Sequence, residues 1–155
     1  MSDPHGFWFL GTAPSFGASF SLALMLLAAV LFTVGWRLAA RKNFAAHRWV
    51  QTGAVCLNAV VVLAWMIRRF WLWVRPEIPS QLGHTTYAVT TVHALVGALG
   101  LLLGVFVVLV GHELLPQRLR FVNYKPYMRG AYALYMLGTV MGVVVYVVVY
   151  GGGLK

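Results

Sequence analysis

Acidic side chains are almost absent from this sequence. Only three of its 155 residues are acidic, Asp3, Glu77 and Glu113, against twelve lysines and arginines. All three lie outside the long apolar runs. A proton-coupled transporter usually needs a carboxylate inside the membrane, and general acid–base catalysis often relies on a carboxylate pair. The sequence therefore argues against both classes of protein.

Cysteine is equally scarce. Cys56 is the single cysteine, so no intramolecular disulfide can form, and an enzyme that relays electrons through a thiol pair is excluded. We interpret Cys56 as a small apolar filler. No glycine-rich loop follows a strand pattern, as phosphate-binding motifs require. These absences leave no catalytic motif, and we do not expect an enzyme.

Charge of either sign is low for a chain of this size. Only 10% of the residues are charged and 61% are hydrophobic, whereas soluble domains carry roughly 25% charged residues. A soluble fold with this composition could not cover its surface with polar groups. Lipid is therefore the expected solvent.

Long apolar runs dominate what remains. A run of roughly 20 residues is enough to cross the hydrocarbon core as a helix, and the backbone must satisfy its own hydrogen bonds there. The sequence predicts an all-α, integral membrane four-helix bundle in up-down-up-down order, one transmembrane domain over residues 1–155. The expected helices cover about residues 16–40, 44–74, 86–112 and 127–150.

The connections between these helices are short. Asn43 is the expected N-cap of the second helix. Pro76 and Pro79 are expected to end that helix, because proline lacks a backbone N–H and disfavours helical geometry before it. Residues 75–80 are thus predicted to form a loop.

The basic residues predict the orientation. Eight flank the first and third connections, while four flank the second connection and the C-terminus; in this order they are Arg37, Arg41, Lys42, Arg48, Arg118, Arg120, Lys125 and Arg129, then Arg68, Arg69, Arg75 and Lys155. By the positive-inside rule, both termini lie on the non-cytoplasmic side of a multi-pass protein of the cell inner (cytoplasmic) membrane. The net charge of +9 then reflects topology and anionic lipid, and we expect no nucleic-acid partner.

Small and aromatic residues mark faces for helix packing. Glycines let helix backbones approach closely in lipid. The candidate packing residues are Gly97, Gly100 and Gly104 in the third helix, and Tyr132, Tyr135, Gly138, Gly142 and Tyr146 along the fourth. Two interpretations stay open: a seam within the bundle, or a docking face for another membrane subunit.

Histidines and arginines are the candidate ligands for a cofactor. His47 and His112 lie at matched depth near the cytoplasmic surface and are the one histidine pair placed to hold a haem. His93 lies inside the third helix, where it could bond Tyr87, Thr90, a quinone or a haem propionate, or simply serve packing. Arg68 and Arg69 are placed for lipid headgroups or a propionate. No metal site is expected, and haem is the possible cofactor.

Several short motifs resemble a known family. They are Arg41-Lys42 followed by His47, Tyr87 followed by His93, and Arg129, Tyr135 and Gly142 to Tyr146 in the fourth helix. Over about residues 20–150 the chain resembles the CtaM-like family of small four-helix membrane proteins, a domain of unknown function linked to the assembly of haem-copper oxidase. The chain departs from the family where it has Arg68 and Arg69, and again at Tyr124, Lys125 and Tyr127, because the family usually has histidine near both places.

The resemblance implies a non-catalytic membrane protein that assists the assembly of a respiratory haem-copper oxidase, or is an accessory subunit of that or another electron-transfer complex. Lipid and other membrane subunits are then its partners. Two alternatives remain from the residues themselves. One is a b-type cytochrome subunit that exchanges electrons with quinone, and the other is a purely structural membrane subunit.

Overall fold

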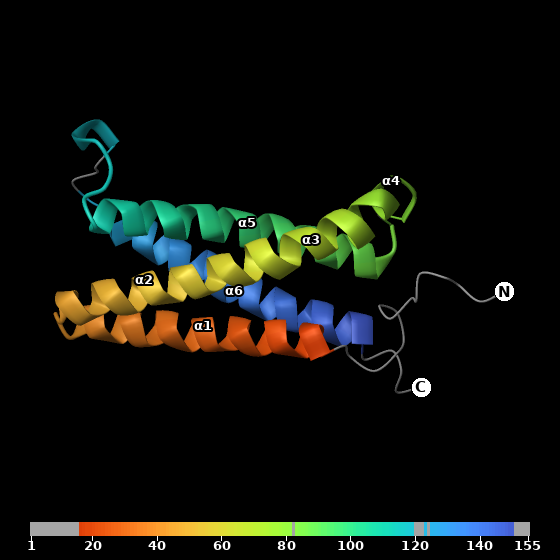
Figure 1. Cartoon of the computed structure of the whole chain (residues 1–155), viewed down its shortest axis with the longest axis horizontal. Helices are drawn as coiled ribbons and strands as arrows, with labels where there is room; N and C mark the ends of the chain where they lie inside the picture. Colours follow the sequence, from red (N-terminus) through yellow and green to blue (C-terminus); the bar gives the residue numbers. More distant parts are fainter. Residues whose placement is uncertain (1–15, 82, 120–122, 124, 151–155) are drawn as a thin grey trace.

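The computed structural model describes residues 16–81, 83–119, 123 and 125–150. Four residues used in the predictions above, Asp3, Arg120, Tyr124 and Lys155, lie outside this part. The described chain is all-helical (Figure 1). Its main helices are α1 (Phe16–Ala40), α2 (Phe44–Val61), α5 (Thr85–Gly111) and α6 (Lys125–Tyr150).

Four helical segments are long and apolar enough to cross a membrane. They are Phe16–Ala40, Phe44–Gln81, Thr85–Gly111 and Lys125–Tyr150. Apart from the end of the second segment, their limits agree with the predicted helices to within two residues. The agreement follows from the solvent, because a run of apolar residues in lipid has no alternative to the helix.

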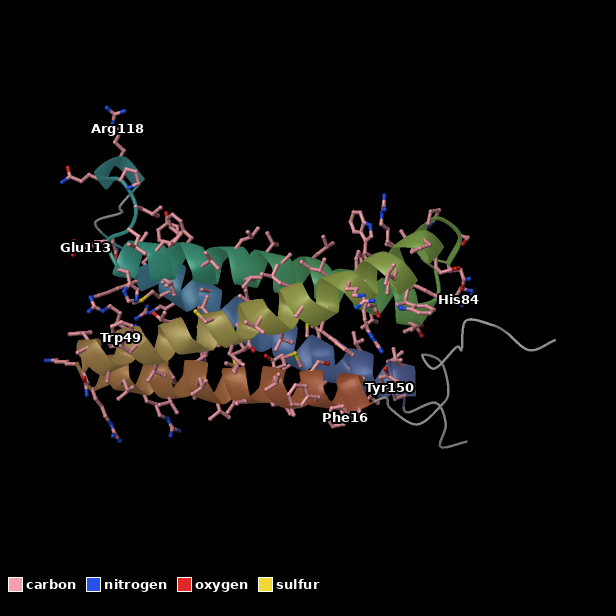
Figure 2. All side chains as sticks on the ribbon, in the orientation of Figure 1. Phe16, Trp49, His84, Glu113, Arg118 and Tyr150 are labelled. Carbon is pink, nitrogen blue, oxygen red and sulfur yellow. The ribbon has the colours of Figure 1, made fainter. Side chains whose placement is uncertain are left out.

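Two antiparallel hairpins build the bundle. α1 packs chiefly on α2 and α5 chiefly on α6, and weaker contacts join α1 to α6 and α2 to α5. The start of α1 and the end of α6 lie at the same end of the bundle, as Phe16 and Tyr150 show, while Trp49 and Glu113 lie at the other end (Figure 2). We call the end with Trp49 and Glu113 the basic end and the opposite one the tyrosine end.

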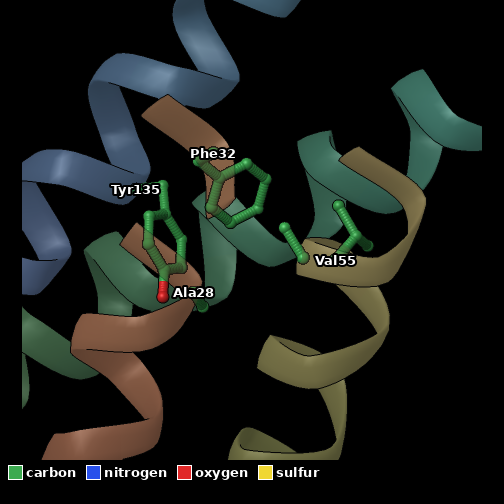
Figure 3. Close-up of a cluster of buried hydrophobic side chains, with 5 residues drawn as sticks. Ala28, Phe32, Val55 and Tyr135 are labelled. Atoms are coloured by element: carbon green, nitrogen blue, oxygen red, sulfur yellow. The ribbon is translucent and has the colours of Figure 1, made fainter. Parts of the chain in front are cut away.

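The core lies between the helices near the middle of the bundle. It is formed by Ala28 and Phe32 of α1, Ala54 and Val55 of α2, and Tyr135 of α6 (Figure 3). Many large apolar side chains are exposed elsewhere, and in three of the four segments fewer than a quarter of the residues in the most apolar stretch are buried. An apolar exterior around a small core is the arrangement expected of a protein solvated by lipid.

The second segment continues past residue 74, contrary to the prediction of a loop over residues 75–80. A 3₁₀ turn, η3 (Arg75–Glu77), and a short helix, α4 (Ile78–Gln81), follow instead. Pro76 lies in the first positions of η3 and Pro79 is the second residue of α4. At such positions a backbone N–H has no partner within the helix, so a proline costs no hydrogen bond there. Each proline therefore begins a new turn.

The same segment contains two π-helical turns. η1 (Val62–Met66) and η2 (Phe70–Val74) flank the short α3 (Ile67–Arg69). Over these turns the segment leaves α1 and crosses toward the start of α5 (Figure 1), and η2 contacts α5. π turns often mark functional positions in helices.

At the basic end, α1 and α5 terminate with the same motif. Lys42 and Glu113 adopt left-handed conformations, with φ of 62° and 58°. After α1, the Lys42 and Asn43 amides donate to the Ala39 and Leu38 carbonyls, which is the Schellman pattern. The side chain of Asn43 accepts from the Ala46 amide at 3.3 Å, so the predicted N-cap of α2 is confirmed.

Candidate functional site

Three tyrosines of α6, Tyr132, Tyr135 and Tyr146, contact α1. The Tyr135 hydroxyl donates to the Met25 carbonyl at 2.9 Å, and its ring centroid lies 4.3 Å from that of Phe32. Tyr132 lies 3.3 Å from the Thr33 hydroxyl, and Tyr146 lies 2.9 Å from that of Ser19. The predicted aromatic face therefore serves a contact within the chain, where three hydroxyls link α6 to α1 along its length.

The candidate glycines also lie between helices of this chain. A Cβ placed on Gly100 would lie 3.5 Å from Leu134, one on Gly104 would lie 3.5 Å from Val55, and one on Gly138 would lie 3.9 Å from the Gly97 Cα. Gly100, Gly104 and Gly138 are buried. These positions bring α5 close to α2 and α6, so the bundle itself occupies the predicted packing faces.

His47 is bonded to α1. Its Nδ1 lies 2.7 Å from the Gly35 carbonyl oxygen, and because a carbonyl only accepts, Nδ1 carries the proton. One turn further, the Gln51 amide donates to the Phe32 carbonyl at 3.2 Å. Both bonds tie polar side chains of α2 to backbone oxygens of α1, and they explain why polar residues occur on this face of α2.

His112 is bonded to α2 instead. Its Nε2 lies 2.8 Å from the Thr52 hydroxyl, and that hydroxyl donates its proton to the Arg48 carbonyl at 2.8 Å. Thr52 must therefore accept from Nε2–H. The ring also meets Trp49 edge to face, with centroids 5.4 Å apart.

This arrangement does not fit a haem held by His47 and His112. His47 and Thr52, the contact of His112, are separated by about 140° around α2, so the two rings approach different faces of that helix. The cavity among Phe32, Asn58 and Tyr135 in the middle of the bundle has a volume of about 10 Å³. That volume suits about one water molecule, and a porphyrin is far larger.

His93 is the candidate whose ring nitrogen is left without a partner. It lies in α5, and its Nδ1 is buried with no hydrogen-bond partner among the described residues. Thr90, a predicted partner, donates to the Thr86 carbonyl instead. A Cβ placed on Gly142 of α6 would lie 3.1 Å from His93 Cε1 and 2.8 Å from the Met25 sulfur. The imidazole and the thioether therefore meet across this glycine.

Arg68 and Arg69 lie toward the tyrosine end of the second segment. Arg69 donates to the Tyr150 hydroxyl at 3.4 Å, and its guanidinium lies 4.9 Å from the centre of the Trp65 ring. Arg75, which the sequence analysis used only for orientation, lies 4.1 Å from the centre of the Trp71 ring. Arg68 is exposed. Arginines interleaved with tryptophans are typical of the headgroup region of a bilayer.

Three residues beside the candidate histidines were not expected from the sequence: Met25, Gln51 and Thr52. Gln51 and Thr52 follow His47 within two turns of one helix, so the cluster of polar residues was a visible signal. Met25 carries no such signal, because methionine in an apolar run is ordinary core material. Only the packing of α1 on α6 brings it to His93.

Comparisons with protein-family models, with curated proteins and with solved structures found no match to this chain. The resemblance to the CtaM-like family accordingly rests on the short motifs of the sequence.

Proposed function

We propose that this chain is a non-catalytic four-helix protein of the cell inner membrane that acts by lateral contact with another membrane protein. Its partner is a respiratory haem-copper oxidase or a related electron-transfer complex, which it helps to assemble or joins as an accessory subunit. The class of partner comes from the motifs that resemble the CtaM-like family.

The observation that carries this proposal is that polar side chains between the helices are hydrogen-bonded within this chain. Tyr132, Tyr135, His47, Gln51 and His112 all bond groups of neighbouring helices in this chain. The mid-bundle cavity of about 10 Å³ leaves no room for a substrate. Contact with other molecules then falls to the exterior, where large apolar side chains such as Leu95, Leu99 and Leu102 of α5 are exposed.

The proposed orientation places the basic end in the cytoplasm. Arg37, Arg41, Lys42 and Arg48 surround the connection between α1 and α2 at that end. The tyrosine end then faces the non-cytoplasmic side, together with both chain termini. Arg69 and Arg75 lie over the rings of Trp65 and Trp71 there, and Arg68 is exposed, which suits the headgroups of the outer leaflet.

Affinity purification in mild detergent tests the proposal. The tagged protein is isolated from its native membrane, and partners are identified by mass spectrometry. We expect subunits of an oxidase or another electron-transfer complex, and we expect oxidase activity to fall when the chain is deleted. The variant Leu99→Arg places a charge on the exposed face of α5. This change should reduce the recovery of the partner.

An optical spectrum of the purified chain separates this proposal from the cytochrome alternative. We expect no b-haem α-band in the reduced-minus-oxidised difference spectrum. A stoichiometric α-band would contradict the proposal, and so would normal oxidase assembly after deletion of the chain.

A further inference from the structure

An unpaired nitrogen inside the bundle is the starting point. His93 Nδ1 is buried without a hydrogen-bond partner among the described residues, although burying an unsatisfied polar group is costly. The ring also interacts with the Gly138 backbone. Because Nδ1 has no partner, a hydrogen bond from the ring to the Gly138 carbonyl must come from Nε2–H, which leaves a lone pair on Nδ1. Fixing the distal nitrogen in this way is how proteins orient metal-binding histidines.

The end of a methionine side chain lies close to this ring. A Cβ placed on Gly142 would lie 2.6 Å from Met25 Cε, 2.8 Å from Met25 Sδ and 3.1 Å from His93 Cε1, the carbon between the two ring nitrogens. The two side chains come from α1 and α5, and because Gly142 of α6 has no side chain, the end of the Met25 side chain packs over it beside the ring. Three helices thus place one nitrogen donor and one sulfur donor on neighbouring side chains within the spans.

The donor types select the kind of ion. A thioether is a soft, uncharged ligand that favours Cu(I), and imidazole also suits copper. Divalent ions are disfavoured by charge, because none of the acidic residues, Asp3, Glu77 and Glu113, lies in the sequence between residues 16 and 74, 85 and 111, or 125 and 150. An uncompensated charge is costly inside a membrane. A monovalent ion bound by two neutral ligands has a net charge of one, the smallest for any metal cation.

We infer that His93 Nδ1 and Met25 Sδ form a binding site for Cu(I) inside the helix bundle. Two donors are enough, because Cu(I) accepts a linear two-coordinate geometry. The inference goes beyond the proposed function and does not depend on which complex the chain contacts.

Anaerobic titration with Cu(I), in competition with a chromophoric Cu(I) chelator, tests the site. The protein carries Cys56→Ser, because the exposed thiol of Cys56 would itself bind Cu(I). We expect one equivalent of Cu(I) to be retained. His93→Ala and Met25→Leu should each weaken binding by at least about tenfold, whereas the control variants His112→Ala and Met66→Leu should not.

A third variant tests the geometry with both ligands still present. In Gly142→Ala the new methyl group would collide with the end of the Met25 side chain, so the sulfur must move away and Cu(I) binding should weaken. X-ray absorption of the Cys56→Ser protein should show one sulfur and one nitrogen scatterer on copper. Retention of no Cu(I), unchanged binding in both ligand variants, or a spectrum without sulfur would overturn the inference.

Discussion

At the residue scale, three side chains from α2 and α6 bond the backbone of α1. Tyr135 donates to the Met25 carbonyl, Gln51 to the Phe32 carbonyl and His47 to the Gly35 carbonyl. These oxygens already accept bonds within α1, so each side chain adds a second bond rather than replacing one. Polar side chains in a bilayer commonly join helices in this way, at about 0.6 kcal/mol each on average.

Substitution of Tyr135 tests the strength of one such bond. Tyr135→Phe removes the hydroxyl and leaves the ring on Phe32, so we expect a loss of about 1 kcal/mol in the free energy of unfolding. Tyr132→Phe is the matched control, because its hydroxyl lies 3.3 Å from Thr33 and should contribute less. Unfolding in mixed detergent micelles measures both, and an equal or larger loss in Tyr132→Phe would contradict the assignment.

The sequence identified the tyrosines and histidines as noteworthy but not their partners. His47 and His112 were paired because their depths match, and depth is readable from position along a helix. The direction in which each ring points depends on how α2 is rotated against α1 and α5, and no local pattern records that rotation. For the same reason the sequence does not predict that Met25 lies beside His93.

At the element scale, helix ends and glycines set how the four helices fit. The span limits were predictable, since hydropathy alone defines them. The helical turns after residue 74 were not, because Pro76 and Pro79 disrupt a helix in its interior but suit its first turn. The π turns at Val62–Met66 and Phe70–Val74 also had no recognisable signal in the sequence.

The end of α1 offers a test of backbone strain. Lys42 has a φ of 62°, which costs a residue with a side chain roughly 1–2 kcal/mol, while glycine loses more chain entropy on folding. We expect Lys42→Gly to be more stable than Lys42→Ala by about 0.5–1 kcal/mol. Both variants remove the same charge, so their difference isolates the backbone. Equal thermal stability of the pair would refute this explanation.

The close approach of α5 and α6 offers a test of helix packing. A leucine at Gly138 would extend into the Gly97 backbone, whose Cα lies 3.9 Å from the position of an added Cβ. We expect Gly138→Leu to lose about 1–3 kcal/mol through overpacking. Gly53→Leu is the control, since nothing lies within 4 Å of its added Cβ. Monodispersity and thermal unfolding in detergent compare the two, and tolerance of Gly138→Leu would show that the helices are not in close contact.

At the scale of the whole molecule, lipid as the solvent explains both the architecture and its predictability. The composition excluded a soluble fold, and four apolar segments of sufficient length followed. In the described part of the chain, polar side chains such as His47, Gln51 and Tyr135 join helices, whereas Thr90 and Thr139 bond carbonyls of their own helices. The central claim is therefore that all four segments cross a bilayer, with the basic end in the cytoplasm.

Cysteine labelling in intact spheroplasts tests that claim most directly. In a Cys56→Ser background, single cysteines replace Ser80 at the tyrosine end, Gln117 at the basic end and Val140 within α6. We expect a membrane-impermeant maleimide to label Ser80→Cys in intact spheroplasts, Gln117→Cys only after permeabilisation, and Val140→Cys in neither condition. Labelling of Ser80→Cys and Gln117→Cys from the same side, or ready labelling of Val140→Cys, would contradict the account.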